Sequence, residues 1–323
     1  MNKNQEQIKI VCLGGGIGTS TLLKGLKLYN PKLTVVTSMV DDGGSSGRIR
    51  KGYNMMPPGD IISCIAALIP DEQKELAELL TYRFPGFDKT NKTLGGHKLG
   101  NLIMLAEFLR TGDFYKALAK TKEIFGITAE LFPATDIRTH LSATTKDGRR
   151  IHTEETLDLA LYSEPYGLKK IYVSPKNAPV NEKIITNIMQ ADIIISGPGD
   201  LYTNQLPVLV VPKIKEAFLK SPAKKIFVLN IANKPFETKN FTLKNFLVAI
   251  TDHLGTFPFD TIIANNNHTL KIPKKYRYKY IKIDKEFTEH KQPFTLIQKD
   301  LVNEDFPLYH NAKKLAEVVI KNI

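Results

Sequence analysis

The chain has 323 residues, of which 42% are hydrophobic and 24% are charged, and this balance is typical of a globular protein rather than a disordered one. Its longest apolar runs are too short to cross a membrane. The polar first residues carry no apolar signal core and no Arg-rich transit pattern, so we expect a cytoplasmic protein without a membrane span.

The formal net charge of +12 has three possible explanations, which differ in what the excess lysines contact. Their scattered pairs favour a solvated surface, phosphorylated small molecules come second, and nucleic acid is the least favoured partner. The two cysteines, Cys12 and Cys64, have no CxxC spacing, and the seven histidines form no metal-ligand pair. We therefore expect Cys12 in the core and no structural zinc site.

The first forty residues predict a β–α–β unit. A β-branched apolar run from Ile8 to Leu13 stops at three consecutive glycines, and a second such run covers 33–40. Between them, apolar residues over 19–28 follow a helical spacing. Such a unit implies a parallel sheet with a right-handed crossover.

The middle of the chain combines a helical stretch with a β-rich insertion, which we expect at about 127–175. Within it, 139–144 and 149–153 flank a Lys-Asp-Gly turn and predict an antiparallel hairpin. In the stretch before it, three-to-four spacing predicts helices over 61–68, 72–82, 99–110 and 113–125.

Strand and helix patterns alternate again after residue 175. No repeat or low-complexity linker divides the chain. We therefore expect one α/β domain over 1–323, with a Rossmann-like, doubly wound and mainly parallel sheet that carries the β-rich insertion. The later helices are expected over 180–189, 206–220, 243–254 and 311–320, and the later strands over 192–196, 225–230 and 261–264.

The first candidate site is the glycine-rich turn between the first strand and the first helix. Glycines let a phosphate approach the backbone, and the following helix points its free N–H groups at the anion. The turn is no Walker loop, and a threonine replaces the third glycine of a dinucleotide fingerprint. Phosphate binding is favoured over a purely structural turn. The candidate ligands are Gly14, Gly15, Gly16, Gly18 and Thr19.

The second candidate follows the second strand, where a Rossmann fold presents an acid to a ribose hydroxyl. Two adjacent carboxylates can instead hold magnesium against a phosphate, or one can act as a base. Arginines at 48 and 50 can bind phosphate, and the alternative to all of these is a solvated polar loop. The candidates are Asp41, Asp42, Gly43, Gly44, Ser45, Ser46 and Arg48.

Two further polar segments open helices. Asp60 follows a Pro-Pro-Gly turn and is either an N-cap or a site residue. His97 and Asn101 lie in a glycine-flanked segment at a helix start, where His97 can transfer a proton or donate to a phosphate. The alternative is a structural histidine. The catalytic candidates are therefore Asp41, Asp42 and His97.

The segment 196–203 repeats the pattern of the first turn in the second half of the chain. A strand, a Gly-Pro-Gly turn and a helix follow one another, so both turns are expected at the crevice where this fold class binds ligands. We expect the amide hydrogens of the two turns to hold one diphosphate between them. The candidates here are Gly197, Gly199, Asp200, Tyr202 and Thr203.

These five motifs, in the same order along nearly the whole chain, resemble those of the YvcK-type gluconeogenesis factors of the CofD-like family, which also contains 2-phospho-L-lactate transferase. The motif from Asp41 to Arg48 is the most specific and resembles the regulatory branch. The resemblance implies a cytoplasmic bacterial protein with a Rossmann-like core that binds UDP-sugars, notably UDP-N-acetylglucosamine. Such proteins support cell-wall precursor supply and cell shape during gluconeogenic growth.

The resemblance leaves the chemistry open between two branches. A regulatory protein binds its nucleotide-sugar without turnover and requires no cofactor. A transferase moves a phospho-acyl group from a nucleoside diphosphate donor and uses magnesium. A homo-oligomer and a regulatory protein partner are further expectations.

The chain departs from the family pattern in two places. The usual Thr-Gln-x-Gly-Glu-Thr loop corresponds to Asn233–Thr238, where only the final Glu-Thr is kept, and the arginine of the usual Arg-His pair is replaced by Tyr309. Tyr276 matches a ligand-site tyrosine of the regulatory branch. It lies in a strip of alternating lysines and tyrosines, 274–280, which is typical of a lysine-protected edge strand or, less favoured, of a surface that stacks single-stranded nucleic acid.

Overall fold

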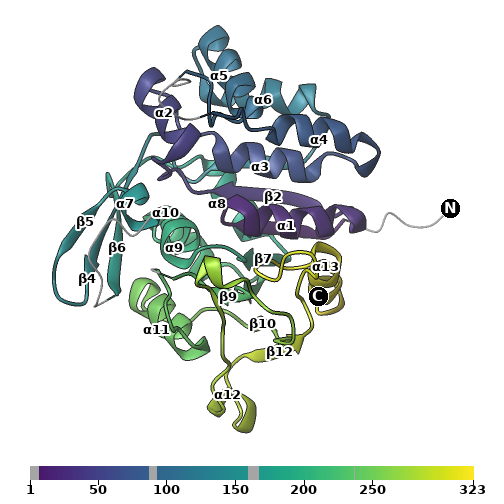
Figure 1. Ribbon diagram of the computed structural model, residues 1–323, viewed down its shortest axis with the longest axis vertical. Helices are drawn as coiled ribbons and strands as arrows, with labels where there is room; N and C mark the ends of the chain where they lie inside the picture. The colour runs from purple at the N-terminus through teal and green to yellow at the C-terminus, as the bar shows by residue number, and fades with distance from the viewer. Residues whose placement is uncertain (1–6, 87–92, 159–166, 236) are drawn as a thin grey trace.

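The computed structural model describes residues 7–86, 93–158, 167–235 and 237–323. Its centre is a seven-stranded sheet with the order β12-β10-β8-β7-β1-β2-β3, in which all neighbouring strands are parallel. The chain builds outward from β1 on one side and then, from β7, on the other (Figure 1). This reversal creates a switch point between β1 and β7. The strands are β1 (Lys9–Leu13), β2 (Lys32–Thr37), β3 (Glu130–Pro133), β7 (Ile193–Ser196), β8 (Lys224–Val228), β10 (Thr261–Asn265) and β12 (Thr295–Lys299).

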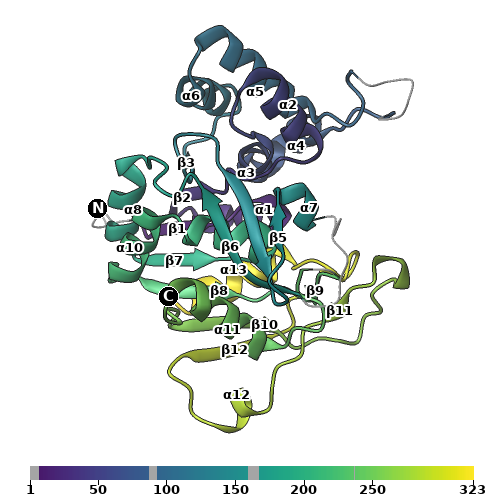
Figure 2. The ribbon, with the colours of Figure 1, turned by 90° about the vertical axis from the view of Figure 1, so that its left-hand side faces the viewer.

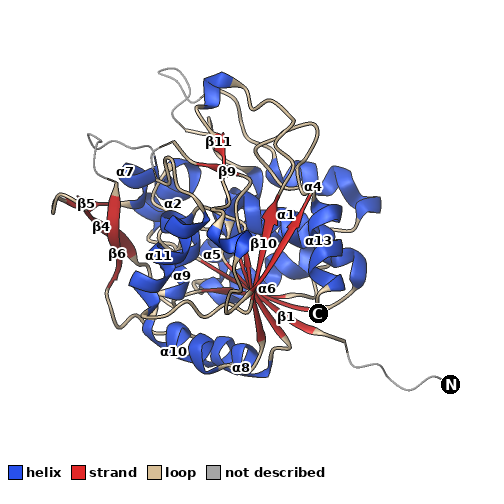
Figure 3. Ribbon diagram, turned by 90° about the horizontal axis from the view of Figure 1, so that it is seen from below, coloured by secondary structure: helices blue, strands red, loops and turns tan. Residues whose placement is uncertain are grey.

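Helices cover both faces of this sheet, which is therefore buried on both sides (Figure 3). Ile10 and Cys12 of β1 pack in one core with α1, α3 and α13, whereas Val11 and Leu13 pack in the other with α8, α10 and α11. The predicted Rossmann-like, doubly wound class is confirmed. The helices on the two faces are α1 (Gly16–Leu26), α3 (Gly59–Leu68), α13 (Ala312–Lys321), α8 (Glu182–Gln190), α9 (Leu206–Leu209), α10 (Pro212–Lys220) and α11 (Leu243–Leu254), with the π-helix η3 (Leu201–Gln205) before α9 and the 3-10 turn η1 (Lys27–Tyr29) after α1.

A further helical layer lies beyond α3, at the top of Figure 1. It contains one helix that the sequence did not predict, because the segment after Asp42 reads as a polar loop. Residues with low helix propensity, two glycines and two serines, form its first turn. Burial of Ile49 and Arg50 in its second half compensates for this. The layer consists of α2 (Gly44–Tyr53), η2 (Asp71–Gln73), α4 (Lys74–Thr81), α5 (Leu99–Thr111) and α6 (Phe114–Ile124).

The β-rich insertion is a three-stranded antiparallel sheet with the order β5-β4-β6 (Figure 2). The expected hairpin is present, since β4 pairs antiparallel with β5. The sequence predicted neither β6 nor β3, and β3, although it lies within the bounds expected for the insertion, pairs with β2 in the main sheet. The elements are β4 (His140–Thr145), β5 (Arg150–His152), α7 (Glu154–Asp158) and β6 (Leu168–Ser174).

The lysine–tyrosine strip is not an edge strand of the main sheet, whose edges are β12 and β3. It forms the 3-10 turn η4 and the short strand β11, which pairs antiparallel with β9. The sequence also missed β12. The elements of this region are β9 (Ala232–Asn233), η4 (Lys274–Tyr276), β11 (Lys279–Tyr280) and α12 (Glu286–Glu289).

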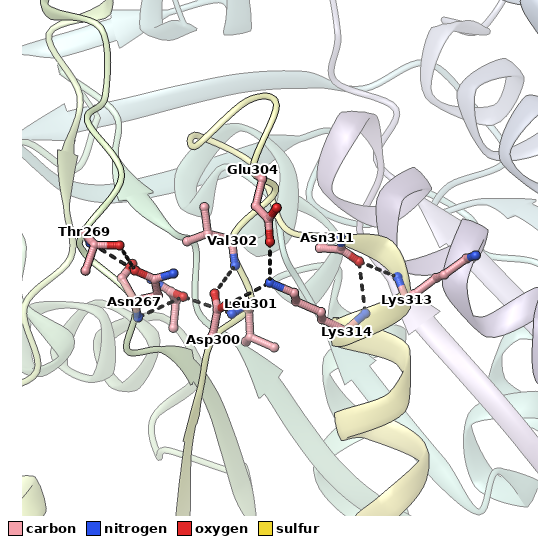
Figure 4. A network of polar contacts seen from close by, with 10 residues as sticks. Asn267, Thr269, Asp300, Leu301, Val302, Glu304, Asn311, Lys313 and Lys314 are labelled. Atoms are coloured by element: carbon pink, nitrogen blue, oxygen red, sulfur yellow. Dashed lines mark hydrogen bonds and ion pairs between the residues drawn. The ribbon is translucent and has the colours of Figure 1, made fainter.

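A polar network fixes the loop between β12 and α13 (Figure 4). Lys314 of α13 forms ion pairs with Asp300 at 2.8 Å and with Glu304 at 3.4 Å. Asn311 caps α13 by accepting the N–H groups of Lys313 and Lys314. The loop residues that precede the cap are thereby held at the carboxyl end of the sheet. Within the described ranges, no helix is both long and apolar enough to cross a bilayer.

Candidate functional site

The two glycine turns lie side by side, because β1 and β7 are neighbouring parallel strands. A Cβ atom on Gly18 would lie 2.2 Å from the carbonyl oxygen of Pro198, so the turns are in direct contact. Gly16 and Gly197 have φ angles of 63° and 87°, which residues with side chains rarely adopt. Both turns therefore border the switch point.

Two amide groups of the first turn, those of Gly15 and Gly16, have protein acceptors. The N–H of Gly15 donates to Oδ1 of Asn204 at 2.7 Å, and the carboxylate of Asp60 accepts the N–H of Gly16. Asn204 Nδ2 donates in turn to Asp60 Oδ2 at 3.2 Å. A carboxylate of the protein thus occupies the position at the start of α1 where a phosphate was expected.

The second turn is closed in the same way. The N–H of Gly199 donates to Oδ1 of Asn230 at 2.9 Å. Glu237 accepts the N–H groups of Tyr202 and Thr203, the latter at 2.9 Å. Glu237 belongs to the loop from 233 to 238 in which the sequence departs from the family pattern, and it retains this buried role; residue 236 of that loop lies outside the described residues. These bonds engage some of the amide hydrogens of the two turns, and the expectation that the others jointly hold one diphosphate stays a prediction.

The segment from Asp41 to Arg48 divides its side chains between the site and the scaffold. Asp41, Ser45 and Ser46 face the site. Asp42 instead accepts the N–H of Glu155 at 2.8 Å. Arg48 donates to the carbonyl oxygen of Gly95 at 2.7 Å. The two adjacent carboxylates therefore do not point the same way.

Arg50, which the sequence proposed as a phosphate ligand, is buried away from the site. Its guanidinium donates to the carbonyl oxygens of Thr139 and Met39, the second at 3.2 Å. These bonds tie α2 to the segment that leads into β4. Arg50 is therefore a structural residue.

Asp60 and Asp41 are two acidic groups in one wall of the site. Asp60 is not the N-cap of α3, a position held by Pro58. Burial, and then the charge of Asp41, raise the pKa of Asp60 to about 7. Burial also raises the pKa of Asp41, against the hydrogen bonds from Ser46 and Gly43. The ammonium group of Lys98 lies near both and donates to Ser63 Oγ at 2.8 Å; burial lowers its pKa.

His97 and Asn101 both hold the hydroxyl group of Ser45, His97 from behind the site and Asn101 from its border. Nδ1 of His97 lies 2.9 Å from Ser45 Oγ, and Asn101 Nδ2 donates to the same oxygen at 2.9 Å. Burial, and then the charges of Arg48 and Arg83, lower the pKa of His97, which keeps the ring neutral. The histidine orients a hydroxyl and does not itself reach the site.

A cleft of about 590 Å³ opens at the switch point. Among the predicted residues, all in the described part of the chain, Gly14, Thr19, Asp42, Arg48, His97, Gly197, Tyr202 and Tyr276 do not border it. The predicted residues that do are Gly15, Gly16, Gly18, Asp41, Gly43, Gly44, Ser45, Ser46, Asn101, Gly199, Asp200 and Thr203.

The loop fixed by Lys314 supplies one wall of the cleft. Tyr309 lies on this wall and stacks on Phe306, with ring centroids 5.0 Å apart. His310 follows it, and burial lowers its pKa to about 4. Tyr276, the expected ligand residue, packs edge-on against Phe306 instead, and Tyr278 borders the cleft in its place.

Sequence reasoning missed several residues that border the cleft. The sequence could have identified Lys98 and Asn204, because each directly follows a predicted site residue. Tyr278 lies in the lysine–tyrosine strip, two residues after the expected ligand residue Tyr276, whereas Arg83 carries no local signal, since only tertiary folding brings it to the switch point. The missed residues include Arg83, Lys98, Asn204, Lys234, Tyr278 and His310.

A metal site built by the protein alone is not present in the described ranges, where no three His, Cys, Asp or Glu side chains gather. Asp41 and Asp60 both border the cleft, and their charges interact. Two carboxylates can hold magnesium only together with water or substrate phosphate oxygens.

Comparisons with known proteins agree on one family. A model described as 2-phospho-L-lactate transferase CofD matches residues 10–303. A Bacillus subtilis (strain 168) protein named gluconeogenesis factor is 38% identical over 277 residues, covering 85% of this chain and 83% of that protein. A Nostoc sp. relative is 40% identical over 258 residues, covering 80% of this chain and 55% of that longer protein. The crystal structure of a UPF0052 family member from Bacillus halodurans has a TM-score of 0.87 at 30% identity, covering 98% of this chain and 100% of that one.

Proposed function

The chain belongs to the CofD family, in its YvcK-type gluconeogenesis-factor branch, and from that premise we propose that it binds a nucleotide-sugar in the switch-point cleft as a regulatory protein. The proposed ligand is a UDP-sugar, with UDP-N-acetylglucosamine first. In this role the protein acts in the cytoplasm and links cell-wall precursor supply and cell shape to gluconeogenic growth.

The observation that carries the proposal is the cleft itself. Its volume of about 590 Å³ lies within the roughly 300–1,000 Å³ of small-molecule sites. Its walls differ in character, since Ser45 and Asn101 offer polar groups whereas Tyr278 and Tyr309 offer aromatic surface. A ligand with a base, a charged linker and a sugar matches such a cleft better than a uniformly polar or uniformly apolar ligand does.

Isothermal titration calorimetry tests this proposal. We expect UDP-N-acetylglucosamine to bind, and Tyr309→Ser to raise its Kd at least tenfold, because base–aromatic contacts contribute about 1–3 kcal/mol. Tyr172→Ser is the matched control, since Tyr172 is a comparably exposed tyrosine on β6 that does not border the cleft. Absence of binding heat with every UDP-sugar would refute the proposal.

A transferase is the second candidate, favoured by the presence of Asp41 and Asp60 on the cleft. These carboxylates would hold magnesium, which neutralises phosphate charge when bound. In the reaction an acceptor hydroxyl would attack the phosphorus of the phospho-acyl group in a nucleoside diphosphate-linked donor. The bond from that phosphorus to the bridging oxygen would break, and a nucleoside monophosphate would leave. Magnesium-dependent release of that monophosphate, lost in Asp41→Asn, would support this function over regulation.

A further inference from the structure

The bonds inside the glycine turns reduce the number of amide groups that can bind a diphosphate. The amide groups of Gly15, Gly16 and Gly199 donate to protein side chains. The cationic side chains of the cleft wall are therefore the stronger candidates for binding its charge. In the described part of the chain these are Arg83, Lys98 and Lys234.

Lys234 already has acidic partners. Its ammonium group lies 2.8 Å from Asp200 and 3.8 Å from Glu237, so most of its charge is compensated within the protein. For Arg83 and Lys98, by contrast, no described carboxylate oxygen lies within ion-pair distance. Two cations of the same wall therefore remain for an anion.

Arg83 and Lys98 are held next to one another by the backbone. They form an antiparallel β-bridge, flanked by hydrogen bonds of 2.9 Å between the segments that carry them. Arg83 Nη1 donates to the carbonyl oxygen of Gly96 at 2.6 Å, and Lys98 Nζ donates to Ser63 Oγ at 2.8 Å. Both side chains are therefore anchored by neutral groups and retain further N–H donors.

The electrostatics of this pair favour an anion. Burial lowers the pKa of Lys98 and the charge of Arg83 lowers it further, whereas the charges of Asp60 and Asp41 raise it. Burial, and then the charge of Arg83, also lower the pKa of Arg48. Arg83 therefore repels the cationic side chains near it, and an anion bound beside it offsets this repulsion.

We propose that Arg83 and Lys98 form the subsite for the diphosphate of the bound ligand, with Arg83 at the exposed rim and Lys98 deeper in the wall. This assignment rests on the proposed nucleotide-sugar function. In this assignment the phosphates bind side chains at the helical layer, and the glycine turns form the floor of the cleft. An arginine can bind phosphate through two N–H groups, whereas a lysine acts as a point charge.

Calorimetry with inorganic pyrophosphate, UDP and UDP-N-acetylglucosamine tests the subsite in wild type, Arg83→Gln and Lys98→Met. We expect each substitution to raise the Kd of all three ligands about tenfold, which corresponds to about 1.4 kcal/mol, and to weaken the dependence on salt. Arg110→Gln on α5 and Lys122→Met on α6 are controls, since both lie outside the cleft. Thermal unfolding checks the fold, and Arg83→Gln, at an exposed position, remains informative if Lys98→Met fails to fold.

The outcomes separate this inference from the proposed function. If wild type binds the UDP-sugar and neither variant weakens it, the subsite is wrong and the function stands. If wild type binds only pyrophosphate and the variants lose it, the subsite stands and the function is wrong. If wild type binds none of the three ligands, both are wrong.

Discussion

Asn204 on η3 donates a hydrogen bond of 3.2 Å to the carboxylate of Asp60 on α3. The oxygen of the same amide accepts the N–H of Gly15 at 2.7 Å, so one side chain connects α3, the first glycine turn and the helix after the second turn. The three segments come from distant parts of the chain. Asn204 therefore holds the floor of the cleft together.

The contact between the two turns predicts a destabilising substitution. Gly18→Ala is expected to lower the free energy of unfolding by about 1–3 kcal/mol, because its Cβ would lie 2.2 Å from the carbonyl oxygen of Pro198, a backbone atom. Gly52→Ala is the control, since a Cβ there meets no heavy atom within 4 Å. This substitution is expected to leave the free energy of unfolding unchanged or to raise it by up to about 1 kcal/mol. Urea unfolding measures both. Equal stability of Gly18→Ala and wild type would show that the turns do not touch.

Much of the sheet could be predicted from the sequence, because buried parallel strands read as apolar β-branched runs. The runs at β1 and β7 end in glycines, and this pattern located both turns of the switch point. The strand β12 was missed, since its burial is only partial and its residues do not form such a run. The helix α2 was missed because its first turn is rich in glycine and serine, and tertiary packing overrides this low propensity.

The roles of the site residues were less predictable than their positions. A glycine-rich strand-to-helix turn indicates an anion site, but the sequence does not reveal that the carboxyl group of Asp60 itself accepts the N–H of Gly16. Asp42 and Arg48 belong to the most specific motif, yet tertiary partners turn both away from the cleft. Arg83 reaches the cleft through pairing with a segment 15 residues further along the chain, which no local pattern indicates.

The buried guanidinium of Arg50 predicts a stability effect without a binding effect. Arg50→Lys is expected to lower the free energy of unfolding by about 1–3 kcal/mol, because a lysine cannot donate to both Met39 and Thr139 in this geometry. Arg110→Lys, on the exposed face of α5, is the control and is expected to be nearly neutral. Urea unfolding and pyrophosphate titration measure the two properties. Lost binding at unchanged stability would instead make Arg50 a ligand residue.

The two cysteines are predicted to be inert in the folded protein. Burial raises the pKa of Cys12 to about 12 and that of Cys64 well above its usual range, and the thiolate is the reactive form. Labelling with a thiol-specific disulfide reagent at pH 8 is expected to modify neither cysteine in native buffer and both in denaturant. Rapid labelling of the native protein would mean that the core that contains both cysteines opens readily.

The raised pKa of Asp60 predicts how stability depends on pH. Because the folded carboxyl group has a pKa of about 7, above its ordinary 3.8, the folded state binds this proton more tightly than the unfolded state does. Its stabilising contribution is complete below pH 3.8 and is lost as the pH rises through about 7, at about 1.4 kcal/mol for each pKa unit of difference. Asp41, whose pKa burial also raises, acts in the same direction.

Asp60→Asn isolates this effect, since the amide does not titrate. Urea unfolding at pH 4.5 and pH 8 is expected to show a smaller loss of stability in Asp60→Asn than in wild type. Asp71→Asn is the control, because the hydrogen bond from Lys27 lowers the pKa of Asp71. The contribution of Asp71 to stability is therefore lost only as the pH falls below about 3.8. The difference in unfolding free energy between pH 4.5 and pH 8 should thus be the same in Asp71→Asn as in wild type. An equal difference in Asp60→Asn and wild type would mean that this carboxyl group titrates normally and stays charged beside the glycine turn.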